Sequence, residues 1–358
     1  MLPLSATRTR GRHPVTMPSD ASNPIFVHAF PLWKHRFVRR CFPGRRVVFL
    51  RDGAPLPREG TLVLWGMAPL PAGLEPRVEV LRMEDGFLRS VGLGAELARP
   101  LSWVVDAHGM YYDATRPSGL ELLLADTRFT PELLARARAL RERVVREGLS
   151  KYNVGSQGWR RPPGARHVVL VAGQVESDAS LAHGAPGLRS NLELLRTVRR
   201  ERPDSHLVYK PHPDVLAGLR LRGAGEAQAL QACDEVVGDV PMPAMLAQVD
   251  EVQVLTSLAG FEALLRGLPV VCHGQPFYSG WGLTDDRAPL PRRQRRLGLD
   301  ELVAAALLMY PTYLGPRGPV TPEQALDELA AWKARSAGPR PWWWEGWRFL
   351  LRRFIGVR

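Results

Sequence analysis

Strand-like and helix-like segments alternate along this chain in two runs, and this alternation most constrains what it can fold into. In the first run the strand candidates are residues 45–50, 61–66, 78–83 and 102–107. A helix-like stretch from Ile25 to Arg40 precedes them, and apolar residues at helical spacing predict a long helix over about 131–147. Strands that alternate with helices favour parallel sheets, so the pattern predicts an α/β protein with a parallel sheet in each run.

A turn-rich connector, SKYNVGSQGWRRPPGAR at 150–166, separates the two runs. The second run has strand candidates at 167–174, 206–210, 249–257 and 269–274. With 358 residues the chain is longer than the roughly 250–300 at which single cores stop growing. We therefore expect a disordered leader, an N-terminal α/β domain, a C-terminal α/β domain and a helical, aromatic and basic tail, at 1–24, 25–160, 161–316 and 317–358.

Composition excludes several classes of protein. No run approaches the ~20 apolar residues of a membrane-spanning helix, and the leader lacks the apolar core of a secretory signal. Three scattered cysteines, Cys41, Cys233 and Cys272, do not form a disulfide framework or a zinc motif, which favours a reducing, cytoplasmic compartment. The formal net charge of +12 favours polyanionic partners, but no nucleic-acid-binding motif accompanies it.

The motif EDGFLRSVG at 84–92 directly follows a strand candidate. Side chains at the carboxyl end of a strand in an open α/β sheet project toward the ligand crevice. Glu84 and Asp85 repel each other, so one of them is a candidate general base with a raised pKa, and Arg89 is a candidate clamp for a ligand carboxylate. Taken alone, a solvated acidic turn with a paired arginine is the more common reading of such a motif.

The motif GQVESDAS at 173–180 follows the first strand of the second run. Gln174 and Asp178 lie in its turn, and Asp178 is placed to cap a helix that begins at the next residue. The same carboxylate is a candidate nucleophile toward an anomeric carbon. Capping is the simpler reading, and the pattern alone does not decide between them.

Two further motifs suit a phosphate. In VYKPHPD the flanking prolines hold Lys210 and His212 rigidly after a strand, although a surface histidine in a proline-rich loop fits as well. In LTSLAGFEALLRG, Thr256 and Ser257 precede a helix whose free N–H groups suit an anion, and Glu262 is a candidate ligand for a ribose diol. An ordinary helix cap predicts the same local structure there.

Two aromatic segments remain. The loop GQPFYSGWGLTDDR at 274–287 is typical either of a wall around a sugar or base or of plain packing. The tail RPWWWEGWRFLLRRFIGVR at 340–358 combines tryptophans with arginines, which favours an interfacial helix on an anionic membrane over a helix docked on its own protein.

The order of these motifs resembles bacterial GT-B enzymes that use CMP-activated acidic sugars, and most closely the KpsC/LipB-type capsule polysaccharide Kdo transferases. The resemblance covers about 25–316. It is carried by EDGFLRSVGLG, PLSWVVDAHGMYYDATRPS, LSKYN, GQVESDAS, NLELLRTVR, VYKPHPDVLAG, TSLAGFEALLRG, PFYSGWGLTDDR and LDELVAAALLMYPTY. Members of that family commonly carry two transferase modules; this chain resembles a single one, closer in wording to the second.

The resemblance implies two Rossmann-like domains facing a cleft, and a retaining β-Kdo transferase. Its donor would be CMP-Kdo and its acceptor an oligo-Kdo linker on a (lyso)phosphatidylglycerol anchor of a capsule. Asp178 matches the family's candidate nucleophile, and Glu84 and Asp85 match the carboxylates of which one acts as acid or base.

The resemblance also implies how the donor is held. Lys210, His212, Thr256 and Ser257 match residues facing the CMP phosphate, Glu262 matches the cytidine-ribose side, and Arg89 is a candidate for the Kdo carboxylate. No metal and no cofactor beyond the donor are expected, because a cationic grip and a helix N-terminus offset the leaving charge.

Several partners and alternatives stay open. The expected place is the cytoplasmic face of the inner membrane, where a basic protein meets anionic lipid and other capsule assembly proteins, and no nucleic acid is expected. One alternative is a transferase for another CMP-linked acidic sugar, such as a sialic acid. The other is a non-catalytic module of capsule assembly or export.

Overall fold

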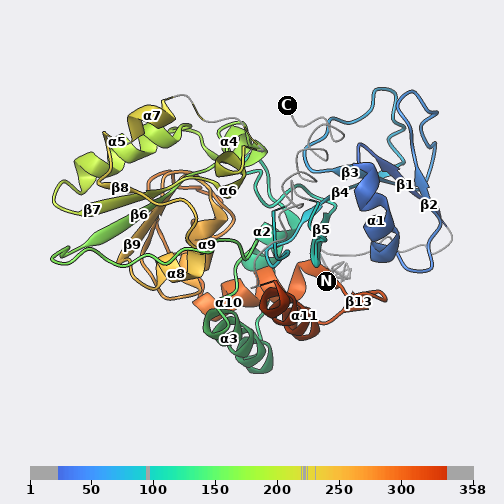
Figure 1. The fold of residues 1–358 in the computed structure, drawn as a ribbon. Coiled ribbons are helices and arrows are strands. Elements are labelled where there is room, and N and C mark those ends of the chain that lie inside the picture. Colours follow the sequence, from blue (N-terminus) through green and yellow to red (C-terminus); the bar gives the residue numbers. More distant parts are fainter. Residues whose placement is uncertain are drawn as a thin grey trace, which may run out of the picture.

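Two β-sheets lie side by side in the computed structural model, which describes residues 23–93, 97–218, 220, 223, 225–229 and 231–336 (Figure 1). The first sheet has seven strands in the order β13-β12-β5-β4-β3-β1-β2. Their bounds are β1 Ile25–His28, β2 Val47–Phe49, β3 Thr61–Trp65, β4 Glu79–Asp85, β5 Ser102–Asp106, β12 Pro311–Leu314 and β13 Pro319–Val320. The leader residues 1–22 and the aromatic tail at 340–358 lie outside the described residues.

The first sheet is mixed, which corrects the expectation of a parallel sheet in the first half. Strands β1 to β4 are parallel, but β5 pairs antiparallel with β4 and β12 pairs antiparallel with β5. A parallel pair requires a crossover connection, usually a helix. No helix is assigned in the described part of the link between β4 and β5, and the chain returns directly beside β4.

The helix expected from Ile25 to Arg40 is also corrected at its start. Ile25 and Val27 face the core as alternate residues of β1, so their two-residue period describes a strand. A short 3-10 turn, η1 at Leu32–Lys34, and the helix α1 at His35–Cys41 follow.

The second sheet is parallel throughout, as predicted. Its order is β11-β10-β9-β6-β7-β8, and every pair in it is parallel. The strands are β6 Val168–Ala172, β7 His206–Lys210, β8 Glu235–Val236, β9 Glu251–Val254, β10 Val270–Cys272 and β11 Asp285–Asp286. All residues of β6 are buried, which fits a strand covered on both faces.

Helices cover both faces of the second sheet (Figure 1). One face packs against α5, and the other packs against α8 and α9. The helices of this half are α4 Ala179–Gly184, α5 Asn191–Glu201, α6 Pro213–Leu216, α7 Glu226–Ala229, α8 Met242–Leu246 and α9 Leu258–Leu264. Short helices therefore start after β6, β7 and β9, next to the polar motifs.

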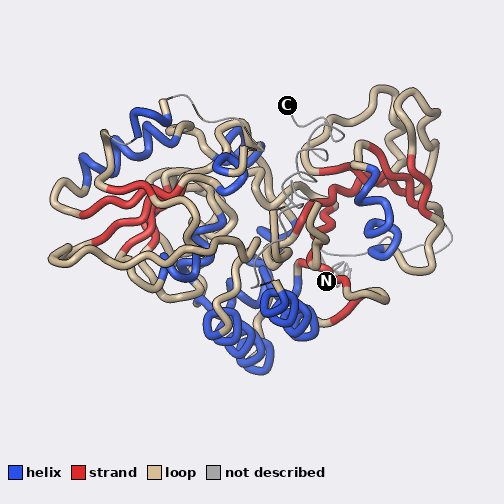
Figure 2. Tube along the Cα trace, in the orientation of Figure 1, coloured by secondary structure: helices blue, strands red, loops and turns tan. Residues whose placement is uncertain are grey.

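Segments far apart in the sequence meet at the base of the molecule, where α3 lies beside α10 and α11 (Figure 1, Figure 2). Thr130 caps α3 and Pro131 occupies its first position, so the long helix predicted there is confirmed. The helices of this region are α2 Gly119–Asp126, α3 Pro131–Arg146, α10 Leu299–Val303, the π-helical turn η3 Ala304–Met309 and α11 Pro322–Arg335.

One apolar cluster extends across both halves. It joins Val104 and Leu120 of the first half to Val168 and Val252 of the second. Together with the return of β12 to the first sheet, this shared core makes the two halves parts of one packed body. The boundaries placed at residues 160 and 316 stay predictions.

None of the helices in the described part of the chain is long and apolar enough to cross a bilayer.

Candidate active site

Glu84 and Asp85 end β4, and two buried cations hold Asp85. Lys34 Nζ lies 2.9 Å from Asp85 Oδ1, and Arg89 Nε lies 2.6 Å from Asp85 Oδ2. The Asp85 side chain is only 14% exposed, and those of Lys34 and Arg89 are 5% and 1% exposed. The motif is therefore an enclosed charge network, and the solvated acidic turn is not what the structure shows.

Lys34 is a member of this network that the sequence analysis missed. Its ammonium lies 3.3 Å from the centroid of the Trp65 ring, with the rings of Trp33 and Trp103 farther out. A cation over the face of a tryptophan is attracted by the ring quadrupole. The sequence signal for this contact is weak: Trp33 and Lys34 are adjacent and precede a basic helix. The contact of Lys34 with Trp65 depends on the pairing of β1 with β3, which the sequence does not reveal.

The two carboxyl groups titrate in opposite directions. Burial, followed by repulsion from Asp85, raises the pKa of Glu84 to about 7. Burial also disfavours the charge of Asp85, but Lys34 and Arg89 outweigh it and hold the pKa of Asp85 well below its usual range. Asp85 is thus a fixed anion, while Glu84 is poised to exchange a proton near neutral pH.

Arg89 lies behind Asp85. Its Nη1 donates to the Ser90 hydroxyl at 2.8 Å, while Nη2 is buried without a hydrogen-bond partner. Two nitrogens of the guanidinium, Nε and Nη1, already have partners within the protein. A contact between Arg89 and a sugar carboxylate therefore stays a prediction, and it would have to use Nη2.

Asp178 is the N-cap of α4, as one of its two readings predicted. Its carboxylate accepts a hydrogen bond from the Ser180 amide at 2.8 Å, and the residue is exposed. Gln174 lies beside it: its amide group donates to the Thr256 hydroxyl at 2.9 Å and accepts from the Thr256 backbone N–H at 2.7 Å. Gln174 Nε2 also lies 3.3 Å from the Ser180 hydroxyl, so it ties the turn before α4 to the turn before α9.

His212 and Lys210 follow β7 but point to different partners. His212 caps α6, and its Nδ1 accepts from the Asp214 N–H at 3.1 Å, so the neutral ring carries its proton on Nε2. Burial lowers the pKa of His212. Lys210 Nζ donates to the Gly238 carbonyl at 2.6 Å, and burial lowers the pKa of Lys210 to about 8.

Thr256 and Ser257 precede α9, and Ser257 caps it through the Ala259 amide at 3.3 Å. Glu262 is buried inside this helix, where its Oε1 accepts from the Lys151 backbone N–H at 2.8 Å. Burial raises the pKa of Glu262. The carboxyl therefore faces the connector, and a contact with ribose stays a prediction.

Lys151 is the second residue that the sequence analysis missed as a site candidate. Its carbonyl accepts from the backbone N–H groups of Arg89 and Ser90, at 3.2 and 3.1 Å, so the connector joins the Glu84 loop to α9. The ammonium lies 5.3 Å from the Tyr152 ring centroid and makes no hydrogen bond or ion pair within the described residues. Burial opposes its charge, but the surrounding tyrosines and carboxylates raise the pKa of Lys151.

Three of the motifs converge. The Tyr112 hydroxyl lies 3.5 Å from Glu84 Oε2, and the Ala114 N–H of the same segment donates to the His183 carbonyl of α4 at 3.2 Å. The Tyr152 and His212 rings are 6.5 Å apart. The Glu84 loop, the start of α9 and the short helices capped by Asp178 and His212 therefore lie in neighbouring segments, while the amine of Lys210 turns toward Gly238.

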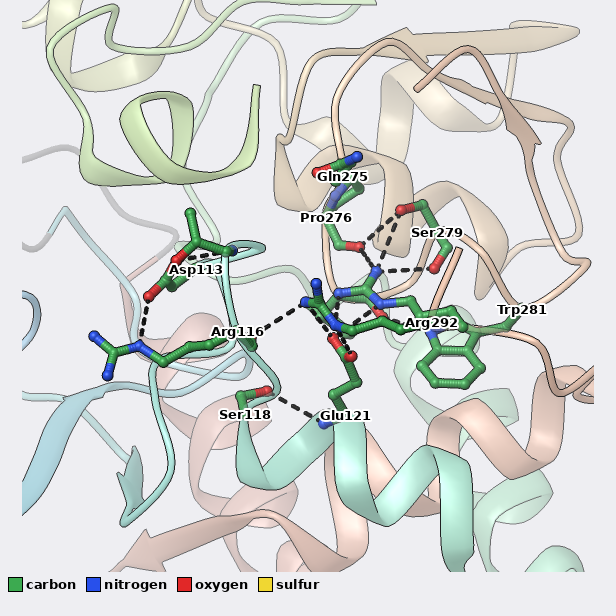
Figure 3. Close-up of polar contacts among 12 residues, drawn as sticks. Asp113, Arg116, Ser118, Glu121, Gln275, Pro276, Ser279, Trp281 and Arg292 are labelled. Atoms are coloured by element: carbon green, nitrogen blue, oxygen red, sulfur yellow. Dashed lines mark hydrogen bonds and ion pairs between the residues drawn. The ribbon is translucent and has the colours of Figure 1, made fainter. Parts of the chain in front are cut away.

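The aromatic loop packs inside the protein. Phe277, Tyr278 and Trp281 are almost fully buried, which supports the packing reading over an exposed sugar wall. Ser279 and Pro276 of this loop belong to a polar network with Glu121 (Figure 3).

The family model described as "Capsule polysaccharide biosynthesis protein" matches residues 72–157 and 160–314. The chain belongs to this family. Its members among curated proteins include "Capsule polysaccharide modification protein LipA" of Neisseria meningitidis serogroup A, which is 42% identical over 303 residues. That match covers 82% of this chain and 43% of LipA. "Lipopolysaccharide-processing protein LpsZ" of Rhizobium meliloti is 42% identical over 298 residues, covering 78% of this chain and 68% of LpsZ.

Two solved structures share the fold. One is "Thermosulfurimonas dismutans KpsC, beta Kdo 2,7 transferase", with a TM-score of 0.72 and 38% identity, covering 87% of this chain and 99% of that chain. The other is "Thermosulfurimonas dismutans KpsC, beta Kdo 2,4 transferase", with a TM-score of 0.71 and 32% identity, covering 86% and 98%. This member of the family spans less than half of the length of LipA.

Across the described ranges no group of three His, Cys, Asp or Glu side chains is arranged to hold a metal ion.

Proposed function

We propose that the chain is a retaining β-Kdo glycosyltransferase that uses CMP-Kdo to extend the oligo-Kdo linker on a (lyso)phosphatidylglycerol anchor during capsular polysaccharide biosynthesis. The similarity to two Kdo transferase structures over nearly their whole length supports a glycosyltransferase. The observation that carries the proposal is geometric: Tyr112 contacts Glu84 in the first half, its segment binds the end of α4, and Gln174 ties the start of α4, capped by Asp178, to the turn before α9. In this proposal the two sheets belong to the two Rossmann-like domains of a GT-B enzyme.

Asp178 acts as the nucleophile and Glu84 as the proton acceptor. The Asp178 carboxylate attacks the anomeric carbon of Kdo, an ester bond forms, and the bond to CMP breaks with CMP leaving as the anion. An acceptor hydroxyl then attacks the same carbon, its proton passes to Glu84, and Asp178 leaves. Two inversions give net retention. A pKa of about 7 suits Glu84 to this second step.

The leaving CMP is held by neutral donors and by one cation, Lys210. His212 presents Nε2–H, and the start of α9 adds the hydroxyls of Thr256 and Ser257 with a favourable helix dipole. Lys210 reaches the phosphate by leaving the Gly238 carbonyl, and Glu262 borders the cytidine side. In this account the protein's own groups offset the charge of the phosphate, so neither a metal nor a cofactor is required.

Lys151 is the cation that meets the Kdo carboxylate in this proposal. Its ammonium has no hydrogen-bond or ion-pair partner within the described residues, while Arg89 is held behind Asp85 with only Nη2 available. A carboxylate placed between them would give Lys151 a counter-ion and satisfy the buried Nη2 group.

The identities favour a 2,7 linkage. The chain is 38% identical to the KpsC module called a 2,7 transferase and 32% identical to the one called a 2,4 transferase. Action at the cytoplasmic face of the inner membrane, with other capsule assembly proteins, fits the net charge of +12.

The test is product analysis. The purified chain is incubated with a synthetic Kdo-lipid acceptor and CMP-Kdo generated in situ, and the product is examined by mass spectrometry and NMR. One added Kdo in β linkage supports the proposal, and position 7 supports the linkage. Transfer from CMP-sialic acid instead would establish the alternative donor. Donor binding with no transfer to any acceptor would establish a non-catalytic assembly or export module.

A further inference from the structure

A buried ion pair links α2 to the aromatic loop, outside the residues assigned to substrate. Arg293 Nε and Nη2 lie 3.0 and 2.9 Å from Glu121 Oε2. On its other side, Arg293 Nη1 donates to the carbonyls of Pro276 and Ser279, at 2.5 and 2.9 Å. The side chains of Arg293 and Glu121 are only 2% and 8% exposed.

This loop holds the C-terminal end of α4. The Gln275 backbone N–H donates to the Gly184 carbonyl at 2.7 Å, and the Ala114 N–H donates to the neighbouring His183 carbonyl at 3.2 Å. A Cβ on Gly274 would come within 2.8 Å of the Gly184 carbonyl oxygen, so the loop and the helix are in tight contact. The last carbonyls of a helix need such partners from outside it.

The same network extends through Arg292 and Arg116 to Asp113 (Figure 3). Arg292 also binds Glu121 and donates to the Arg116 carbonyl at 3.2 Å, and Arg116 Nε lies 3.2 Å from Asp113 Oδ2. Asp113 directly precedes Ala114. This branch runs through the Arg116 side chain, which is 52% exposed, so it holds the end of α4 less firmly than the buried Arg293 contacts do.

The helix α4 has six residues and spans about 9 Å at 1.5 Å per residue. A helix this short is not stable alone, so its position follows the contacts at its two ends. Its first residue follows Asp178, and the Gln174 contact with Ser180 fixes that end. A shift of the Gly184 end therefore tilts the helix about the Ser180 contact and turns the Asp178 carboxylate, which caps the same end.

The use of a charged pair at this buried place is better explained by the geometry of its hydrogen bonds than by a gain in stability. A buried ion pair gains little over an apolar pair of the same volume, because desolvation offsets the attraction. The planar guanidinium instead offers a fixed fork, and here that fork spans one carboxylate and two carbonyls. A lysine has a single charged centre and cannot hold all three.

We propose that Arg293, oriented by Glu121, is a positioning residue: it fixes the 275–279 loop against α4 and so holds Asp178 at the anomeric carbon. The inference rests on the proposed function only in taking Asp178 as the nucleophile. It predicts that the clamp governs the rate of transfer more than the binding of the donor, since small misplacements of a reacting group cost about 100-fold in rate.

The experiment compares Arg293→Lys with Arg292→Lys. Arg292 is the matched control, because it binds the same carboxylate but contacts the Arg116 carbonyl in place of the 275–279 loop. The rates are measured well below the melting temperature of the variant. We expect Arg293→Lys to lose about 30-fold or more in kcat, while its KM for the donor stays within about twofold of wild type. Arg292→Lys should keep kcat within about threefold. Equal kcat losses in the two variants, or a loss confined to KM, would overturn the proposal.

A second measurement separates the clamp from the activity. Hydrogen exchange of the amides in 179–185 and 275–279 should speed up in Arg293→Lys and stay near wild type in Arg292→Lys. Unchanged exchange in Arg293→Lys rejects the clamp even if kcat falls. If the wild-type chain transfers no sugar, the proposed function fails, and the exchange data still decide whether Arg293 positions α4.

Discussion

The two sheets carry their polar residues in different ways. Beside the mixed sheet, the buried cations Lys34 and Arg89 both pair with the Asp85 carboxylate, and Glu84 lies at their edge. Beside the parallel sheet, Asp178, His212 and Ser257 are each the N-cap of a short helix and bind its backbone. One side is built from titrating side chains and the other from helix starts at the carboxyl ends of strands.

This difference explains the division of labour in the proposed reaction. Helix N-termini favour anions without changing protonation, which suits a phosphate and a carboxylate nucleophile. Paired buried charges shift pKa values, which suits the transfer of a proton at neutral pH. If the two sides divide the work in this way, variants beside the mixed sheet should change the pH profile and variants beside the parallel sheet should not.

The largest effect is expected from Asp178→Asn. Asparagine caps a helix about as well as aspartate, so the melting temperature should stay within a few degrees of wild type. The amide is a poor nucleophile, and transfer should fall by about 1,000-fold or more. Melting curves and product formation measured together test this. More than a few per cent of wild-type activity would exclude Asp178 as the nucleophile.

Glu84→Gln should come next, with a loss of about 100- to 1,000-fold in kcat. In the wild type, activity should rise with pH through about 7, because Glu84 must be ionised to accept the proton. The variant should lack this rise. A pH profile of kcat/KM is the measurement, and an unchanged acidic limb in Glu84→Gln would assign the proton transfer to another group.

Lys34→Met should have a smaller effect, part of it on the pH profile of activity and part on stability. Loss of this cation should move the acidic limb to higher pH, because the Lys34 charge lowers the pKa of Glu84. Stability should fall by about 3 kcal/mol, since Asp85 keeps only Arg89 as a close cation. The paired Asp85 stabilises the fold above about pH 4 and loses this effect as it is protonated, so the deficit should shrink at low pH. Urea unfolding at several pH values tests the sign; a deficit that grows on acidification would contradict it.

The smallest effect is expected from Ser257→Ala. Loss of the cap should cost about 1 kcal/mol of stability and raise the donor KM a few-fold, with no change in the pH profile. Unfolding and initial-rate measurements check both parts. A shifted pH profile in this variant would show that the two sides are coupled more tightly than the comparison implies.

Much of the second half could be predicted from its sequence. The run VVLVA is apolar at every position, as in a strand covered on both faces, and each polar motif follows such a strand. Asp178 and Ser257 were predicted as caps from their residue type and from the helices that follow them. These signals are local, so a single sequence contains them.

The first half could be predicted less well because its decisive contacts are not local. The antiparallel return of β5 beside β4, and the arrival of β12 from residues 311–314, depend on pairings between distant segments. Lys34 meets Asp85 across 51 residues, and Lys151 meets Glu262 across 111. The pair of Glu121 and Arg293 spans 172 residues, and neither residue stands in a motif that points to the other.

The most direct test of the central claim is to trap the sugar on the protein. Glu84→Gln is incubated with CMP-Kdo without acceptor, quenched, digested and analysed by tandem mass spectrometry. The account predicts a peptide heavier by one Kdo residue, with the added mass on Asp178. An adduct on another residue, or a β-linked product formed by wild-type protein with no adduct detectable under any quench, would contradict it.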